Sequence, residues 1–153
     1  MNITQTFYDD MATQYDKLFA DWQATTREQA VILDRIFRSR GFDRGARVLD
    51  CACGIGTQAI GLAALGYRVT ASDISEGELR QAQARSAQNG VEIAFHRADF
   101  CALSQVFSRP FELVIAMDNA LPHMLTPQAL KQAVDSIVGQ LAPGGLFVAS
   151  IRS

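Results

Sequence analysis

Hydrophobic and polar positions along the chain follow two different periodicities. Between residues 4 and 37 apolar side chains recur every three or four positions, which predicts an amphipathic helix. We expect its buried face to contain Ala30, Leu33, Ile36 and Phe37. Gly41 and Gly45 bracket a break after this helix. Beyond the break, short apolar runs typical of buried strands alternate with longer amphipathic stretches typical of helices.

This alternation predicts five strands and three further helices. The strands are expected at residues 48–52, 68–72, 91–96, 111–117 and 146–151, and the helices at residues 57–65, 76–89 and 127–141. Thr126 and Pro127 form a helix start, and Pro143-Gly144-Gly145 a stop before the last strand. The last helix has a stripe expected to pack on the sheet, made of Leu130, Val134, Ile137, Val138 and Leu141. Right-handed crossovers then give a parallel sheet covered on both faces.

Composition and charge narrow the functional classes. The 153 residues are 48% hydrophobic and 20% charged, which suits one soluble domain with a substantial core. A formal charge of −2 disfavours a nucleic-acid partner. Residues 1–10 lack the pattern of a signal peptide, and no apolar run is long enough for a membrane span, so a cytoplasmic location is expected and a membrane partner is not. Three cysteines, Cys51, Cys53 and Cys101, favour small buried thiols over a disulfide framework or a metal site.

A glycine turn follows the first strand. Gly54, Gly56 and Ala59 fit the pattern G-x-G-x-x-G/A between a strand and a helix, where backbone amides can approach a ligand. Asp73 ends the next strand and can accept hydrogen bonds from ribose hydroxyls. The pattern favours a nucleoside-bearing cofactor. The alternative is that the glycines only form a tight turn and Asp73 only caps a helix.

Asp50, at the start of the same turn, discriminates between cofactors. A carboxylate there would repel the pyrophosphate of a dinucleotide and attract an ammonium or a sulfonium. S-adenosylmethionine carries both cations together with adenine and ribose. Its product is S-adenosylhomocysteine.

The segments D-C-A-C-G-I-G-T, A-S-D-I-S and L-A-P-G-G together resemble the class I S-adenosylmethionine-dependent methyltransferases. The resemblance implies a Rossmann-like doubly wound sheet of order 3-2-1-4-5. It also implies three sets of cofactor contacts: Asp50, Cys51, Ala52, Gly54 and Gly56 at the methionine end, Asp73 and Ile74 at the ribose, and Ala98, Asp99 and Phe100 at the adenine. Asp99 follows the third strand, at the sheet edge where Asp50 and Asp73 also lie, although an Asp there can instead stabilise a turn.

The fourth strand ends in I-A-M-D-N-A-L-P-H, which places Asp118, Asn119 and His123 beyond the carboxyl end of the sheet. We assign Asp118 to cofactor binding. This stretch resembles the small-molecule N-methyltransferases of glycine and sarcosine, which implies that Asn119 contacts the acceptor amine and that Arg152 binds its carboxylate. His123 could accept a proton or serve as a structural hydrogen-bond partner, and Arg152 could instead be a surface residue.

The N-terminal segment, residues 1–40, is expected to form a helical cap or lid over a core at residues 41–153, within one structural domain. By the same resemblance, tyrosines such as Tyr15 contact the substrate, and Arg27 approaches the methionine carboxylate. Trp22 could belong to a lid or to the core.

The resemblance also implies a further helix and a sixth and seventh strand, which these 153 residues do not contain. We therefore expect an exposed, uncharged fifth strand through which copies of the chain associate. Three functions stay open beside methyl transfer to a small amine: cofactor binding without turnover, NAD-dependent oxidoreduction, which Asp50 disfavours, and a non-enzymatic interaction module.

Overall fold

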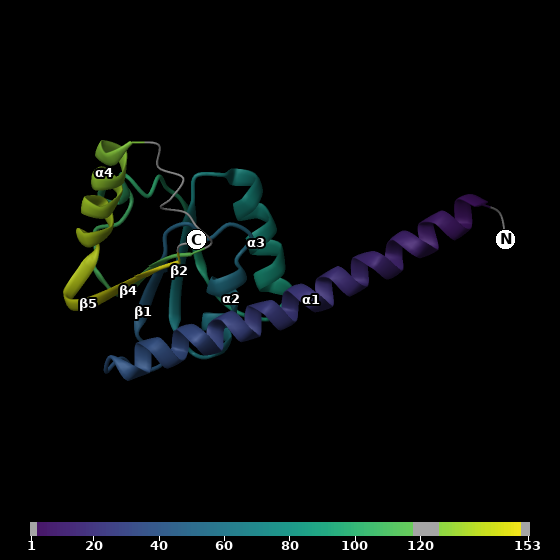
Figure 1. Cartoon of the computed structure of the whole chain (residues 1–153), viewed down its shortest axis with the longest axis horizontal. Helices are drawn as coiled ribbons and strands as arrows, with labels where there is room; N and C mark the ends of the chain where they lie inside the picture. Colours follow the sequence, from purple (N-terminus) through teal and green to yellow (C-terminus); the bar gives the residue numbers. More distant parts are fainter. Residues whose placement is uncertain (1–2, 118–125, 151–153) are drawn as a thin grey trace.

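The computed structural model describes residues 3–117 and 126–150, with side chains from residue 17 onward. Its centre is a sheet in which all neighbouring strands are parallel (Figure 1). The strands are β1 (Arg47–Asp50), β2 (Arg68–Asp73), β3 (Ala94–Arg97), β4 (Phe111–Ala116) and β5 (Leu141–Ala149). Their order, β3-β2-β1-β4-β5, confirms the predicted α/β architecture.

Helices connect the strands in the predicted alternation. They are α1 (Ile3–Ser39), α2 (Thr57–Ala64), α3 (Glu76–Gln88) and α4 (Pro127–Val138). A short 3-10 helix, η1 (Leu103–Gln105), was not predicted. As expected, Thr126 is the N-cap of α4 and its hydroxyl accepts the Ala129 amide at 3.0 Å, while Pro127 opens the first turn.

The two faces of the sheet bury different helices, which produces a three-layer structure. Consecutive β1 residues point to opposite faces, so Val48 joins one core cluster and Leu49 the other. The Val48 cluster includes residues of α1, α2 and α3, such as Phe37. The Leu49 cluster includes η1 and α4 residues, such as Ile137.

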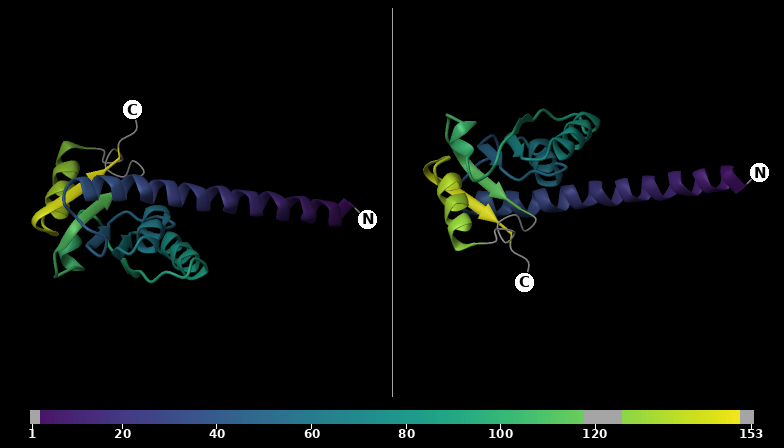
Figure 2. Two further views of the ribbon diagram at one scale, coloured as in Figure 1. Left: turned by 90° about the horizontal axis from the view of Figure 1, so that it is seen from below. Right: turned by 90° about the horizontal axis from the view of Figure 1, so that it is seen from above.

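Helix α1 is long, with 37 residues, and only its C-terminal part packs on the body of the molecule. Ala30, Leu33 and Phe37 are buried as predicted. The N-terminal half extends well beyond the sheet in every view (Figures 1 and 2). None of the described helices combines the length and the apolar character that a membrane crossing needs.

Two predicted buried faces are only partly buried. Ile36 of α1 is 37% exposed. In α4, Ala133 and Ile137 are buried, whereas Leu130, Val134 and Val138 are 40%, 37% and 55% exposed. The predicted α4 stripe is therefore wrong in its extent, since three of its residues are exposed and Leu141 belongs to β5 rather than to the helix.

Two strand starts also differ from the prediction. The third strand begins at Ala94 rather than Val91, because the Val91 amide donates to Ser86 O at 3.1 Å and still completes the end of α3. The fifth strand begins at Leu141, and Pro143-Gly144-Gly145 lies inside it. There the register with β4 shifts between the pairs Phe111↔Leu141 and Leu113↔Leu146. The predicted stop is thus an irregularity within the strand, a position where proline is tolerated.

Candidate functional site

The carboxyl ends of β1, β2 and β4 meet at one edge of the sheet. From β1 the chain continues into α2 on one face, and from β4 it leads toward α4 on the other. A crevice forms where neighbouring strands send their connections to opposite faces, and ligands of open α/β sheets bind there. The topology therefore places a site beyond Asp50 and Ala116.

The turn after β1 is held closely between β2 and α2. The Cys53 amide donates to Ser72 O at 3.0 Å, and the Gly56 amide donates to Cys53 O at 2.9 Å. Gly56 has φ +93°, and a Cβ there would lie 2.9 Å from Ile60 Cδ1. Gly54 has φ +54°, and a Cβ there would meet only Glu78 Oε2, at 3.8 Å. Gly56 is therefore needed for backbone shape and helix packing, whereas Gly54 leaves space on the open side of the turn.

Asp73 fastens this turn to the end of β2. Its Oδ2 accepts the Gly54 amide at 2.9 Å, and its Oδ1 accepts the Ser75 amide at 3.0 Å. The N-cap of α3 is Ser75, whose hydroxyl accepts the Glu78 amide at 3.2 Å. Asp73 therefore holds the glycine turn in place and puts a carboxylate beside it.

A cavity of about 630 Å³ opens at the glycine turn. This volume suits a ligand of cofactor size. The residues that line it are Ala52, Cys53, Gly54, Ile55, Thr57, Asp73, Ser75, Glu78 and Met117. Among these described lining residues there are two carboxylates and no Lys, Arg or His.

The electrostatic potential at the turn is negative. Burial raises the pKa of the Cys53 thiol, and the charges of Asp50, Asp73 and Glu78 raise it further. A pyrophosphate would be repelled here, whereas a ligand with cationic groups and a ribose would be attracted and could donate hydrogen bonds to the acids. The lining thus fits S-adenosylmethionine, as predicted from the sequence.

Asp50 and Cys51 lie behind the cavity rather than in its wall. Asp50 is fully buried, and its Oδ1 accepts the Ala52 amide at 3.3 Å, which fixes the first residue of the turn. The Cys51 thiol is buried and donates to Ile115 O at 3.4 Å, and burial raises its pKa. Asp50 acts on the cavity through its charge, and Cys51 packs in the core.

The residues expected at the adenine, Ala98, Asp99 and Phe100, follow β3, and Ile74, expected at the ribose, follows β2. None of these four residues lines the cavity. Ala98 is buried, and its amide donates to Asp73 O at 3.1 Å. Asp99 is exposed, and its Oδ1 accepts the Cys101 amide at 2.9 Å, so it stabilises a turn in this structure. Phe100 is half-buried against the core, and Ile74 is 59% exposed. The contacts of these residues with the cofactor stay a prediction.

Several predicted residues lie outside the part of the chain that the structure describes: Asp118, Asn119, His123, Arg152 and the side chain of Tyr15. Arg27 is exposed on α1 and is absent from the cavity wall. The sequence reasoning missed Thr57, Ser75, Met117 and Glu78. Glu78 had a usable signal, because Ser75-x-x-Glu78 matches a capping box at the start of a helix.

Trp22 links α1 to the rim of the cavity. Its indole N–H donates to Thr57 Oγ1 at 3.1 Å, and the Arg85 guanidinium lies 4.5 Å from its ring centroid. Three helices therefore meet at this one side chain, beside the start of α2.

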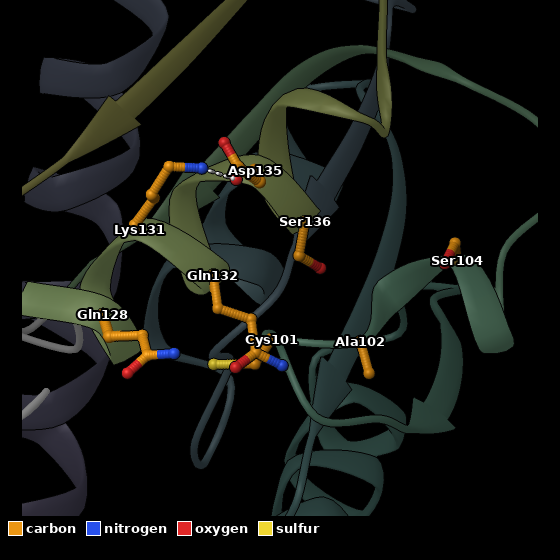
Figure 3. A pocket seen from close by; sticks show the side chains of 8 residues that line it. All are labelled: Cys101, Ala102, Ser104, Gln128, Lys131, Gln132, Asp135 and Ser136. Carbon is orange, nitrogen blue, oxygen red and sulfur yellow. Dashed lines mark hydrogen bonds and ion pairs between the residues drawn. The ribbon is translucent and has the colours of Figure 1, made fainter.

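A second cavity, of about 540 Å³, lies between residues 101–104 and α4 (Figure 3). Most of the residues that line it have polar side chains, and the ion pair between Lys131 and Asp135, at 2.8 Å, lies along it. Ser136 also lines it, and its hydroxyl accepts the Leu103 amide at 2.9 Å, which joins η1 to α4. None of the predicted site residues lines this cavity.

Comparison with known proteins identifies the family. A family model described as "Methyltransferase domain" matches residues 48–145. The ubiquinone biosynthesis O-methyltransferase of Caulobacter sp. (strain K31) is 33% identical over 123 residues, which cover 80% of this chain and 47% of that protein. The chain therefore spans about half the length of such relatives.

Solved structures of similar fold support the same family. DesVI of Streptomyces venezuelae is 26% identical, with a TM-score of 0.75, over 93% of this chain and 57% of that one. The S-adenosylmethionine-bound CalS10 of Micromonospora echinaspora has the same fold, with a TM-score of 0.75, 21% identity and coverage of 91% of this chain and 56% of that one. Together with the glycine turn and its acidic cavity, these matches show that the chain belongs to the class I S-adenosylmethionine-dependent methyltransferase family.

Proposed function

We propose that this chain binds S-adenosylmethionine in the acidic cavity at the glycine turn and takes part in methyl transfer to a small-molecule acceptor. The observation that carries the proposal is the cavity wall, which joins the glycine turn, Asp73 and Glu78 without a basic side chain among the described residues. When bound, the cofactor supplies a methyl group that is already activated by its sulfonium. The protein must then hold the two reactants in line and exclude water.

The described residues support the binding half of this function. The free side of Gly54 leaves room for a ligand to approach the backbone, and Asp73 keeps the turn in that shape. Asp50 and Glu78 add negative charge on either side of the turn. Such a field favours the sulfonium and ammonium of the cofactor over a dinucleotide.

For the acceptor we propose a small amine such as glycine or sarcosine, with Asn119 at the amine, Arg152 at the carboxylate and His123 as a candidate base. The assignments of Asn119 and Arg152 rest on the sequence resemblance, and that of His123 on its place after the fourth strand. A hydroxyl acceptor is the second candidate, because the Caulobacter relative at 33% identity is named an O-methyltransferase. Neither a polynucleotide nor a membrane is proposed as partner, given the net charge of −2.

Calorimetric titration of the purified chain tests the cofactor. We expect S-adenosylhomocysteine to bind, NAD not to bind, and Asp73→Ala to weaken S-adenosylhomocysteine binding at least tenfold. Binding of NAD alone would support an oxidoreductase and overturn the proposal. Binding of neither would favour an interaction module.

Transfer of a labelled methyl group separates the acceptors. Glycine and sarcosine should accept the label if the amine proposal holds, and a phenolic acceptor should do so if the hydroxyl candidate holds. Cofactor binding without transfer to either class would indicate a cofactor-binding chain that does not turn over.

A further inference from the structure

We infer that Glu78 is a second carboxylate that binds the cofactor ribose, beside Asp73, and so helps to determine cofactor specificity. The inference rests on the proposed function, because it concerns the same cavity. Glu78 lies in the first turn of α3, lines the cavity, and was not expected from the sequence.

The local hydrogen bonding explains why the Glu78 side chain faces the cavity. In a capping box the Glu carboxylate accepts the backbone amide of the N-cap residue. Here the Ser75 amide donates instead to Asp73 Oδ1, at 3.0 Å. The other half of the box is intact, since Ser75 Oγ accepts the Glu78 amide at 3.2 Å. Because Asp73 accepts the Ser75 amide, the Glu78 carboxylate is not drawn back toward the start of the helix.

The position of the carboxylate is also defined on the side of the glycine turn. Glu78 Oε2 is 3.8 Å from the point where a Cβ on Gly54 would lie. Asp73 Oδ2 accepts the amide of the same glycine at 2.9 Å. The two carboxylates therefore flank one residue, on the open side of the turn.

Asp73 and Glu78 differ in the hydrogen bonds that their carboxylates already accept. Each Asp73 oxygen accepts one backbone amide, whereas Glu78 shows no side-chain hydrogen bond to any of the residues that the structure describes. A vicinal diol presents two donors, and two adjacent carboxylates can accept one each. Both carboxylates are half-buried, and an acceptor that loses its hydroxyl partner discriminates against the deoxy ligand.

The experiment combines variants of the protein with variants of the ligand. Calorimetry would compare S-adenosylhomocysteine with its 2′-deoxy and 3′-deoxy analogues on the wild type, Glu78→Gln and Glu78→Ala. The matched control is Glu76→Gln, because Glu76 occupies the same helical turn with the same charge, yet is exposed, pairs with Arg97 and does not line the cavity.

We expect both Glu78 variants to weaken S-adenosylhomocysteine binding about tenfold, and Glu76→Gln to change it less than twofold. The decisive result is coupling. One deoxy analogue should lose about tenfold in affinity on the wild type, less on Glu78→Gln, whose amide oxygen is a weaker acceptor, and almost nothing on Glu78→Ala, where the partner of that hydroxyl is gone. A general loss of structure would weaken all three ligands alike and would not produce this pattern.

The outcomes separate the inference from the proposed function. If the wild type binds no S-adenosylhomocysteine, the proposed function fails, and the inference with it. If the wild type binds and the Glu78 variants keep its affinity and both deoxy penalties, only the role of Glu78 is overturned. Should Glu78→Ala fail to fold, Glu78→Gln keeps the size of the side chain and the amide bonded to Ser75, and a smaller deoxy penalty on this variant than on the wild type gives the test.

Discussion

At the scale of single residues, the two glycines of the turn have different tasks. Gly56→Ala combines φ +93° with a Cβ 2.9 Å from Ile60 Cδ1, so we expect a loss of about 3 kcal/mol in the free energy of unfolding. Gly54→Ala has φ +54° and space for its Cβ, so the loss should be about 1 kcal/mol. Urea unfolding followed by circular dichroism measures both.

The variant that costs less stability should have the larger effect on ligand binding. The Gly54→Ala methyl enters the cavity beside Glu78, so the folded variant should bind S-adenosylhomocysteine more weakly than the wild type. If Gly54→Ala bound normally while Gly56→Ala folded normally, the assignment of the two glycines would be wrong.

The sequence was sufficient for the positions of those candidate residues that the backbone fixes, while their contacts with a ligand stay predictions. The glycine spacing and the strand-end acids Asp50 and Asp73 were predicted, because a strand-turn-helix unit fixes where they lie. Glu78 was missed because its direction depends on which acceptor takes the Ser75 amide, and that competition is decided in three dimensions. Cys51 was placed at the ligand, yet the alternation of side chains along the strand turns its thiol into the core.

At the scale of helices and strands, the contact between α1 and α2 depends on Gly61. A Cβ there would lie 2.6 Å from Thr26 O and 2.7 Å from Ala30 Cβ, so α1 would have to move. We expect Gly61→Ala to lower the free energy of unfolding by about 2 kcal/mol or more.

A second helical glycine provides the control for this change. At Gly77 in α3 a Cβ would meet only Ser75 Oγ, at 3.8 Å, so Gly77→Ala should stabilise the protein by about 0.5–1 kcal/mol through helix propensity. Thermal unfolding of both variants should therefore shift the melting temperature in opposite directions. Two shifts of the same sign would contradict the close α1–α2 contact.

The end of α1 is also fastened by a charged network. The Asp34 carboxylate accepts two hydrogen bonds from Arg44, at 3.2 and 2.9 Å, and one from the Tyr67 hydroxyl at 2.7 Å. The hydrogen bonds from Arg44 are the main cause that lowers the pKa of Asp34 below 3.8. Burial, and next the bond to Asp34, raise the pKa of Tyr67.

The sign of the pH effect follows from the lowered pKa. Asp34 stabilises the fold fully above its ordinary pKa, and this contribution is lost as the pH falls through the lower pKa of the folded state. We expect Asp34→Asn to be less stable than the wild type at pH 7 and the difference to shrink as the pH falls below about 4. Urea unfolding at several pH values measures it, and a constant difference down to pH 3 would argue against the network.

The element boundaries show where local patterns were insufficient. Periodicity located the described α-helices and strands but not the short helix η1, because alternating apolar runs are a local property and three residues are too few to show one. It failed at Pro143-Gly144-Gly145, a sequence typical of a loop, because β5 pairs with β4 on both sides of these residues and includes them. It also overestimated the burial of Val134, because only the neighbours in space determine which flank of α4 is covered.

At the scale of the whole molecule, one side of the described fold is apolar and uncovered. Strand β5 is at the end of the sheet and has one strand neighbour within the described residues. No residue from Leu141 to Ser150 is charged or fully buried. Helix α4 lies at the same end of the sheet (Figure 1), with Leu130, Val134 and Val138 on the flank opposite the one that contacts η1 through Ser136.

We propose that copies of this chain associate along β5, and that the exposed flank of α4 adds to the contact. An unpaired strand edge without charge, with proline only at its bulge, can pair with a second strand, and an apolar helix flank beside it adds buried area. Two copies can meet by the same surface around a twofold axis, since an uncharged strand does not repel its own copy.

Light scattering after size-exclusion chromatography, over a range of protein concentrations, measures this association. We expect the wild type to exceed the monomer mass as the concentration rises.

The Ser150 amide donates to Ala116 O, so by alternation the Ala149 amide faces the free edge. Ala149→Pro should therefore block pairing without removing a bond to β4. Val138→Lys should shift the mass toward the monomer through charge repulsion at the α4 flank. A wild type that stays monomeric at high concentration would show that this surface does not bind its own copy, and equal association of both variants and the wild type would place the contact elsewhere on the molecule.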